Sequence, residues 1–290
     1  SREPTVAEPT RLRKALGACW TALLVAAPPL VAIVALFALL DAFDLMSVRL
    51  TPFKRAFIEG VARVAFVAGV ARGLFAPSRP SWRLMPVSDV TAERLSRLAI
   101  AQAAIVSIVN VAEALTDISA SSLPVTAAVQ GVGAVVFGAV TAGAIYGLGE
   151  DDEDDECLGP RVTPRPRWIG FVRLVAWIVV AVMMLAALAG YIPAAWFLSE
   201  QFVWAAGVVG LVSIALPLAM SAIEATFQPT TPFGRTMMSG LGVRRDGVTQ
   251  LGIILSGVVH ILLFVVALVA IVAPWGLQSD DLFGGLRNAY

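Results

Sequence analysis

Residues 17–40 read GACWTALLVAAPPLVAIVALFALL and contain no charged side chain. The hydrocarbon core of a bilayer is about 30 Å thick, so a helix needs roughly 20 apolar residues to cross it. The backbone of such a helix satisfies its own hydrogen bonds, which lipid cannot do for it. We therefore interpret residues 17–40 as a membrane-spanning helix.

Six further apolar stretches of similar length follow along the chain. The spans expected from them lie near 54–75, 97–118, 123–148, 168–190, 200–224 and 250–274. The whole chain is 58% hydrophobic and only 14% charged, which is not the composition of a soluble domain. The sequence predicts an all-α fold: a polytopic membrane bundle of about seven transmembrane helices, forming a single domain over residues 1–290.

Lys and Arg alternate between the connecting segments. The N-terminal segment and the loops after the second, fourth and sixth spans hold 15 of the 21 basic residues, and the opposite side holds four. Cytoplasmic loops of membrane proteins carry the excess of positive charge. The sequence therefore predicts a cytoplasmic N-terminus and an external C-terminus. The external connections at Ser119–Ser122 and Tyr191–Ser199 are expected to be short.

Ionisable residues inside spans are costly and therefore informative. Glu59 and Arg63 stand four residues apart on the second span, where they can pair along the helix. Asn110, Glu113 and Asp117 share one face of the third span. One interpretation of these two groups is a path for ions or protons. The interpretation that we favour is that they form hydrogen bonds between helices and so stabilise the bundle.

Other polar residues lie near the ends or in the middle of spans. Arg173 is about one turn into the fifth span, where it can reach the cytoplasmic interface. Glu200 and Glu224 bracket the sixth span, and we expect both at interfaces. His260 stands in the middle of the seventh span. A pH sensor is one interpretation of it, and a lone histidine with one hydrogen-bond partner is the favoured one.

Small residues recur at the spacing that lets helices approach closely. Gly69 and Gly73 close the second span, and Ala139, Gly143 and Gly147 run along the fourth. Such faces predict contact with another span or another chain.

Prolines mark candidate bending points, because each removes a helix hydrogen bond. Pro28 and Pro29 in the first span are the strongest candidates, and Pro193 and Pro217 are further ones.

The sequence lacks the patterns of an enzyme or a metal centre. Two cysteines and one histidine cannot form a disulfide framework or a histidine cluster. No phosphate-binding loop or nucleophile set is present, so no cofactor, no catalytic activity and no nucleic-acid partner are predicted. The acidic run EDDEDDE at 150–156 lacks the spaced ligands of an EF-hand. We interpret it as a solvated, disordered loop.

Three segments carry a resemblance to a known family. They are GLFAPSRPSWRLMPVSDVTAERLSR at 73–97, LGVRRDGVTQL at 241–251, and APWG at 273–276 with Asp280, Asp281 and Leu282 after it. The first resembles a cytoplasmic linker in large bacterial mechanosensitive channels of the small-conductance family, in the branch with extra transmembrane helices ahead of the pore. The other two segments are similar to later parts of the same region.

The resemblance implies a function that the residues alone do not give. The chain would be the membrane-tension-sensing region of an ion channel in the bacterial inner membrane, relevant to osmotic stress. The pore-lining helix and cytoplasmic domains of the family are absent from residues 1–290, so the pore would lie C-terminal to them. Its partners would be the lipid bilayer and further copies of the chain, joined through that pore domain.

Two alternatives remain open. One is a secondary transporter with a substrate site at the Glu59/Arg63 and Asn110/Glu113/Asp117 groups, which requires these residues to converge on a cavity. The other is a membrane scaffold that binds partners through its small-residue faces.

Overall fold

The chain, in a computed structural model, is described over residues 11–76, 88–119, 123–156, 168–226 and 245–275. Over these ranges it forms seven α-helices and no strand, which confirms the predicted all-α fold. The helices are α1 (Arg11–Ala42), α2 (Thr51–Phe75), α3 (Asp89–Ile118), α4 (Leu123–Glu156), α5 (Trp168–Leu188), α6 (Ile192–Thr226) and α8 (Arg245–Val272). Two 3₁₀-helices, η1 (Val48–Leu50) and η3 (Ala273–Trp275), precede α2 and follow α8.

Five of the described helices are long and apolar enough to cross a bilayer. They are α1, α3, α4, α6 and α8, the last counted together with η3. The described apolar part of α5, Arg173–Leu188, is shorter, and α2 carries five charged side chains. The protein is therefore a multi-pass membrane protein.

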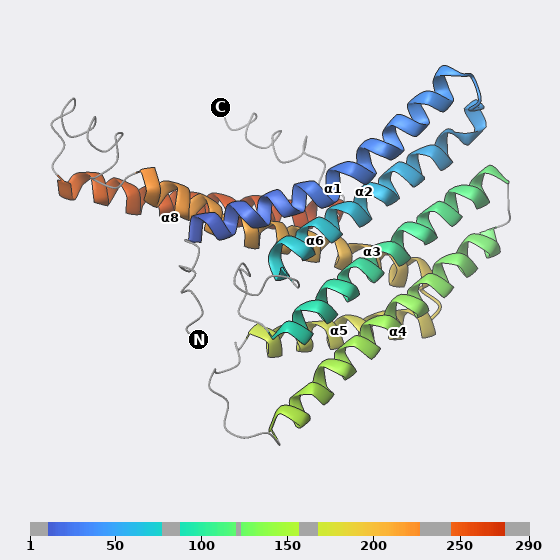
Figure 1. The fold of residues 1–290 in the computed structure, drawn as a ribbon. Helices are drawn as coiled ribbons and strands as arrows, with labels where there is room; N and C mark the ends of the chain where they lie inside the picture. Colours follow the sequence, from blue (N-terminus) through green and yellow to red (C-terminus); the bar gives the residue numbers. More distant parts are fainter. Residues whose placement is uncertain (1–10, 77–87, 120–122, 157–167, 227–244, 276–290) are drawn as a thin grey trace, which may run out of the picture.

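Neighbouring helices run in opposite directions. The Ser107 hydroxyl of α3 donates to the Gly60 carbonyl of α2 at 3.1 Å, and Gln102 of α3 donates to the Thr141 hydroxyl of α4 at 2.8 Å. Figure 1 shows the α1–α2 and α3–α4 hairpins side by side, with their turns toward the same side of the bundle. We call that side, where η1 lies, the η1 end.

Helix α6 is the centre of the bundle, because it packs against α1, α2, α3, α4, α5 and α8. Near its start, the Gln201 side chain donates to the Ile271 carbonyl near the end of α8 at 2.5 Å. Helix α8 therefore runs antiparallel to α6, and its last turn lies at the η1 end. The start of α1 lies at the opposite end.

The main apolar core lies where α2 to α6 meet. Its largest side chains are almost fully buried: Phe137 of α4 is 0% exposed and Met183 of α5 is 2% exposed. The Phe137 ring meets Phe202 of α6 edge to face, with centroids 6.2 Å apart. The buried residues of this core are Val67, Ala103, Val106, Val109, Ala134, Phe137, Met183, Ala195, Trp196 and Val203.

Helices α1 and α2 approach each other at two glycines. A Cβ atom added to Gly69 would lie 2.5 Å from the Ala22 carbonyl oxygen of α1, and one added to Gly73 would lie 2.6 Å from that of Ala18. Backbone atoms cannot move aside as a flexible side chain can. The small side of α2 is therefore what lets α1 pack at this distance.

The small residues of α4 behave differently from those of α2. Ala139 and Gly143 are exposed, and a Cβ atom on Gly143 would meet nothing within 4 Å. A Cβ atom on Gly147 would lie 3.4 Å from the Arg94 side chain. In the described part of the chain, Gly143 therefore makes no close helix contact, and the prediction of contact for this stripe is met only at Gly147.

The predicted external connection Tyr191–Ser199 is wrong, because α6 already begins at Ile192. Gly190 has φ +85° and ends α5. The Gly190 amide donates to the Ala187 carbonyl at 3.1 Å, and the Tyr191 amide donates to the Ala186 carbonyl at 2.9 Å. This pair of bonds is the Schellman motif, which reverses the chain within a few residues. Pro193 then lies in the first turn of α6, where its missing amide is harmless.

The interpretation of residues 150–156 as a disordered loop is also wrong, because α4 continues through the acidic run to Glu156. Extending an existing helix avoids the cost of a new nucleus. The prolines inside helices do not end them either. Helix α1 continues through Pro28 and Pro29 and bends along its length in Figure 1, and α6 continues through Pro217.

We predict that Gly69→Ala and Gly73→Ala each destabilise the bundle by about 1–3 kcal/mol, because the added methyl overpacks against the α1 backbone. The measurement is the free energy of unfolding in detergent micelles, followed by circular dichroism. Gly143→Ala is the matched control. It is expected to be neutral or to stabilise by up to about 1 kcal/mol, because alanine favours the helix. Equal effects at all three positions would contradict this packing.

Candidate functional site

A cavity of about 490 Å³ lies between α2, α6 and the end of α8. We call it the α2–α6 cavity. Four of the residues that line it are polar: Glu59 and Arg63 from α2, and Glu200 and Gln201 from α6. Aromatic rings and small apolar residues form the rest of the wall. These include Ala62, Phe66, Phe197, Trp204, Gly207 and Pro274.

The helices place the polar residues at one depth. Glu59 lies about two turns after the start of α2, Glu200 about two turns after the start of α6, and Asn110 about two turns before the end of α3. All three of these helix ends lie at the η1 end. The polar level is therefore inside the bundle, roughly 12 Å from the helix ends at 1.5 Å per residue.

Asn110 and Glu200 join α3 to α6. The Asn110 amide donates to Glu200 Oε1 at 2.7 Å, and both side chains are half-buried. Glu200 was expected at the first residue of the sixth span, but α6 begins at Ile192, so Glu200 lies about two turns inside the helix. Pro193 was the available signal, since proline favours the first turn of a helix. Glu200 is thus the connecting residue that sequence reasoning missed.

The predicted pair between Glu59 and Arg63 is also wrong. Arg55 Nε donates to Glu59 Oε1 at 2.8 Å, so Glu59 pairs with the arginine one turn earlier on the same helix. Both of these side chains are exposed, and an exposed pair of this kind holds weakly. Nη1 of Arg63 is buried and has no hydrogen-bond partner among the described residues.

Glu113 continues the polar row toward α4. The Gln130 side chain of α4 is close enough to hydrogen-bond to its carboxylate. Oε1 of Glu113 and Oδ1 of Asn110 are nevertheless buried, and each lacks a partner within the described part of the chain. Buried polar atoms are normally paired. Three buried atoms without a partner among the described residues, on Arg63, Asn110 and Glu113, lie near this level of the bundle. Asp117, one turn further along α3, is exposed.

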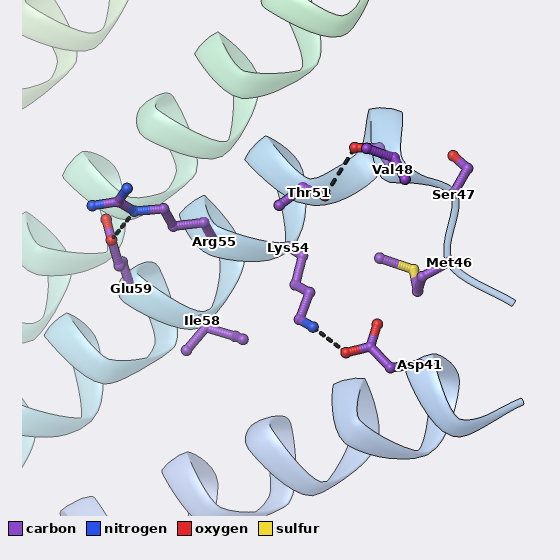
Figure 2. A pocket seen from close by; sticks show the side chains of 9 residues that line it. All are labelled: Asp41, Met46, Ser47, Val48, Thr51, Lys54, Arg55, Ile58 and Glu59. Atoms are coloured by element: carbon purple, nitrogen blue, oxygen red, sulfur yellow. Dashed lines mark hydrogen bonds and ion pairs between the residues drawn. The ribbon is translucent and has the colours of Figure 1, made fainter. Parts of the chain in front are cut away.

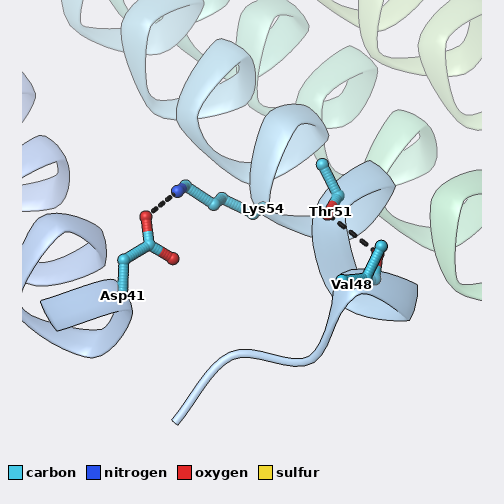
Figure 3. Close-up of polar contacts among 4 residues, drawn as sticks. All are labelled: Asp41, Val48, Thr51 and Lys54. Atoms are coloured by element: carbon cyan, nitrogen blue, oxygen red, sulfur yellow. Dashed lines mark hydrogen bonds and ion pairs between the residues drawn. The ribbon is translucent and has the colours of Figure 1, made fainter. Parts of the chain in front are cut away.

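A second cavity, of about 480 Å³, lies at the η1 end between α1 and α2. We call it the end cavity; Figure 2 shows the nine side chains that line it. Lys54 forms an ion pair with Asp41, which joins α2 to the end of α1. Figure 3 shows this pair beside the Thr51 hydroxyl, which donates to the Val48 carbonyl at 2.8 Å. Glu59 lines this cavity as well as the α2–α6 cavity.

Two other predicted residues lie away from the cavities. Arg173 is exposed near the start of α5. His260 is exposed on α8 and has no hydrogen-bond partner in the described ranges, so the single partner predicted for it is not there. Among the described residues, no three His, Cys, Asp or Glu side chains are grouped so that they could hold a metal ion.

Comparisons with protein-family models, with curated proteins and with solved structures find no match to this chain. The resemblance to mechanosensitive channels therefore rests on the three segments themselves. Residues 77–87, 241–244 and 276–282 of those segments lie outside the described residues.

We predict that Asn110 and Glu200 are energetically coupled. In a double-mutant cycle with Asn110→Ala and Glu200→Ala, the coupling energy should be about 0.6–1.7 kcal/mol, the size found for hydrogen bonds between membrane helices. The measurement is again the free energy of unfolding in micelles. The control cycle pairs Asn110→Ala with Glu224→Ala, an exposed residue at the far end of α6. Those two effects should add to within about 0.5 kcal/mol. A coupling of zero in the first cycle would show that the bond does not hold α3 to α6.

Proposed function

We propose that this chain is a membrane-tension-sensing helical region that couples the state of the bilayer to an ion-conducting pore C-terminal to it. By the resemblance it would lie in a bacterial inner membrane, and the charge distribution would place its N-terminus in the cytoplasm and its C-terminus in the periplasm. Further copies of the chain would assemble with it through the pore domain.

The observation that carries this proposal is the exposure of α8. None of the residues in the apolar span Gly252–Trp275 is buried, and only 11% of the most apolar stretch of α1 is buried. Most large side chains of α8 are exposed, including Ile254, Ile261 and Phe264. Helix α8 packs mainly against α6. Its surroundings are therefore mostly lipid, and lipid contacts decide its position more than protein contacts do.

Such a helix responds to tension through a shift in population. Tension favours the conformation that occupies more area in the membrane plane, and a thinner bilayer favours a more tilted span. A helix held on one side only can tilt without breaking a core. In this scheme α2 to α6 are the fixed frame, α8 is the moving part, and the bend in α1 allows a smaller movement.

We predict that tension changes the distance between α8 and α6. Spin labels at Ile261 and Val209, both exposed, should move by about 5 Å or more, roughly half of a helix diameter. The labels are placed in a chain in which Cys19 and Cys157 are replaced by Ser, and the distances are measured by electron paramagnetic resonance before and after osmotic swelling of liposomes.

The control pair is Ile108 of α3 and Val135 of α4, which are also exposed. These helices belong to the packed frame, so their distance should change by less than about 2 Å, the size of shifts between packed helices. If the two pairs respond equally, or neither responds, the proposed division into frame and moving helix fails.

We also predict that residues 1–290 alone conduct no ions. The α2–α6 cavity lies between α2, α6 and the end of α8, and most of its wall consists of apolar groups. Patch-clamped liposomes that contain the purified chain should show no current under suction. Current that depends on suction would place a pore within this chain.

A second candidate function is transport of a small solute, and one specific observation favours it. Glu59 and Arg63 line one cavity together with Glu200, and Asn110 bonds to Glu200, whereas Glu113 and Asp117 do not line it. Convergence of this kind is what a substrate site between membrane helices requires. It does not conflict with the exposure of α8, because the cavity lies within the frame and beside the end of the moving helix.

A further inference from the structure

The α2–α6 cavity contains two opposite charges that do not neutralise each other. Arg63 and Glu200 line it from different helices, and over the described ranges they form no ion pair with one another. The other two charges nearby are already paired, since Glu59 is held by Arg55. Oε1 of Glu200 accepts a hydrogen bond from the Asn110 amide, which carries no charge.

We propose that this cavity binds a small zwitterion that carries both a carboxylate and an ammonium group. The carboxylate lies beside Arg63 and the ammonium beside Glu200. The apolar part of the molecule lies against Phe66, Phe197 and Trp204. The inference rests on the second candidate function, solute transport, and names the substrate class of that site; it does not depend on tension sensing.

The opposite charges of Arg63 and Glu200 favour a zwitterion over a simple anion or cation. A simple anion at Arg63 is repelled by Glu200, and a simple cation at Glu200 is repelled by Arg63. Both repulsions are strong where little water screens them. A molecule with both charges avoids both. Its carboxylate also supplies the acceptor that Arg63 lacks, and hydrogen bonds between charged groups are the strong ones.

The size and walls of the cavity agree with such an occupant. A volume of about 490 Å³ is within the range of small-molecule sites, which combine apolar walls with a few polar groups. Trp204 donates its indole N–H to the Ala270 carbonyl of α8 at 2.7 Å. That bond fixes the indole beside the cavity, where the ring face can also attract an ammonium group.

Glu59 gives the cavity a route to the η1 end. It lines both cavities, and its bond to Arg55 is an exposed pair within one helix, which opens readily. A solute in the end cavity therefore meets one weak ion pair before it reaches Arg63.

The test uses isothermal titration calorimetry on the whole chain, residues 1–290, in lipid nanodiscs. The zwitterionic probes are L-leucine and glycine betaine. Two further probes each carry half of leucine: 4-methylpentanoate has only the carboxylate, and isopentylamine has only the ammonium group. We expect one or both zwitterions to bind at least about tenfold more tightly than either half-molecule, a factor equal to 1.4 kcal/mol.

Two variants sharpen the test. Arg63→Gln should weaken the zwitterion about tenfold and make isopentylamine the better of the two half-molecules. Glu200→Gln should weaken it similarly and reverse that preference; it retains an acceptor for Asn110, which protects the fold. Glu224→Gln, at the exposed end of α6, should leave binding unchanged. Thermal unfolding of each variant checks that it is folded.

Equal binding of all four probes would mean that the cavity is merely apolar and would overturn the proposal. Failure of both zwitterions to bind at concentrations up to roughly 10 mM would do the same. Transport of a different solute, measured as flux into liposomes, would leave the second candidate function standing while the zwitterion assignment fell. None of these results tests whether tension moves α8.

Discussion

Hydrocarbon accepts no hydrogen bonds, and this constraint governs both the outside and the inside of the bundle. On the outside it favours long apolar helices whose exposed side chains suit lipid, as those of α8 do among the described residues. On the inside it requires polar side chains to find partners on neighbouring helices. The bonds from Ser107 to Gly60, from Gln102 to Thr141 and from Asn110 to Glu200 meet that requirement.

Because lipid is as apolar as the helices, burial of apolar side chains contributes little to holding them together. Close packing and hydrogen bonds have to supply the contacts instead. Gly69 and Gly73 let the backbones of α1 and α2 meet, and Phe137 and Met183 fill the space between α4, α5 and α6. Helix α8 has no buried side chain among its described residues, and it packs mainly against α6. This difference in packing between α8 and the other helices is the physical basis for the proposed response to tension.

The same α6 that holds α8 also carries Glu200, Gln201 and Trp204. Gln201 and Trp204 both donate to backbone carbonyls at the end of α8, while Glu200 accepts from α3. Movement of α8 would therefore disturb the wall of the α2–α6 cavity, and an occupant of that cavity would in turn bias the position of α8. The two proposed functions, tension sensing and solute transport, would therefore both depend on the contacts between α6 and α8.

The sequence alone determined the helices and the alternation of their directions. Apolar length is a local property, so the expected spans at 54–75 and 168–190 nearly coincide with α2 and α5. An error of a few residues in a predicted helix boundary matters more for the polar residues inside the bundle. Because α6 begins at Ile192 rather than at 200, Glu200 lies about two turns inside the helix, where it meets Asn110, and the turn at Gly190 that makes this possible involves only three residues.

Only the tertiary structure decided which polar residues meet. Glu59 lies one turn from Arg55 and one turn from Arg63, and the spacing is the same in both directions. The choice of Arg55 depends on how α2 is rotated against α6. In the same way, the glycines of α2 and the small residues of α4 have the same spacing, yet Gly69 and Gly73 meet α1 whereas Ala139 and Gly143 face outward. Spacing along a helix fixes which residues share a face; the rotation that turns this face toward a neighbour is set by the packing of all the helices together.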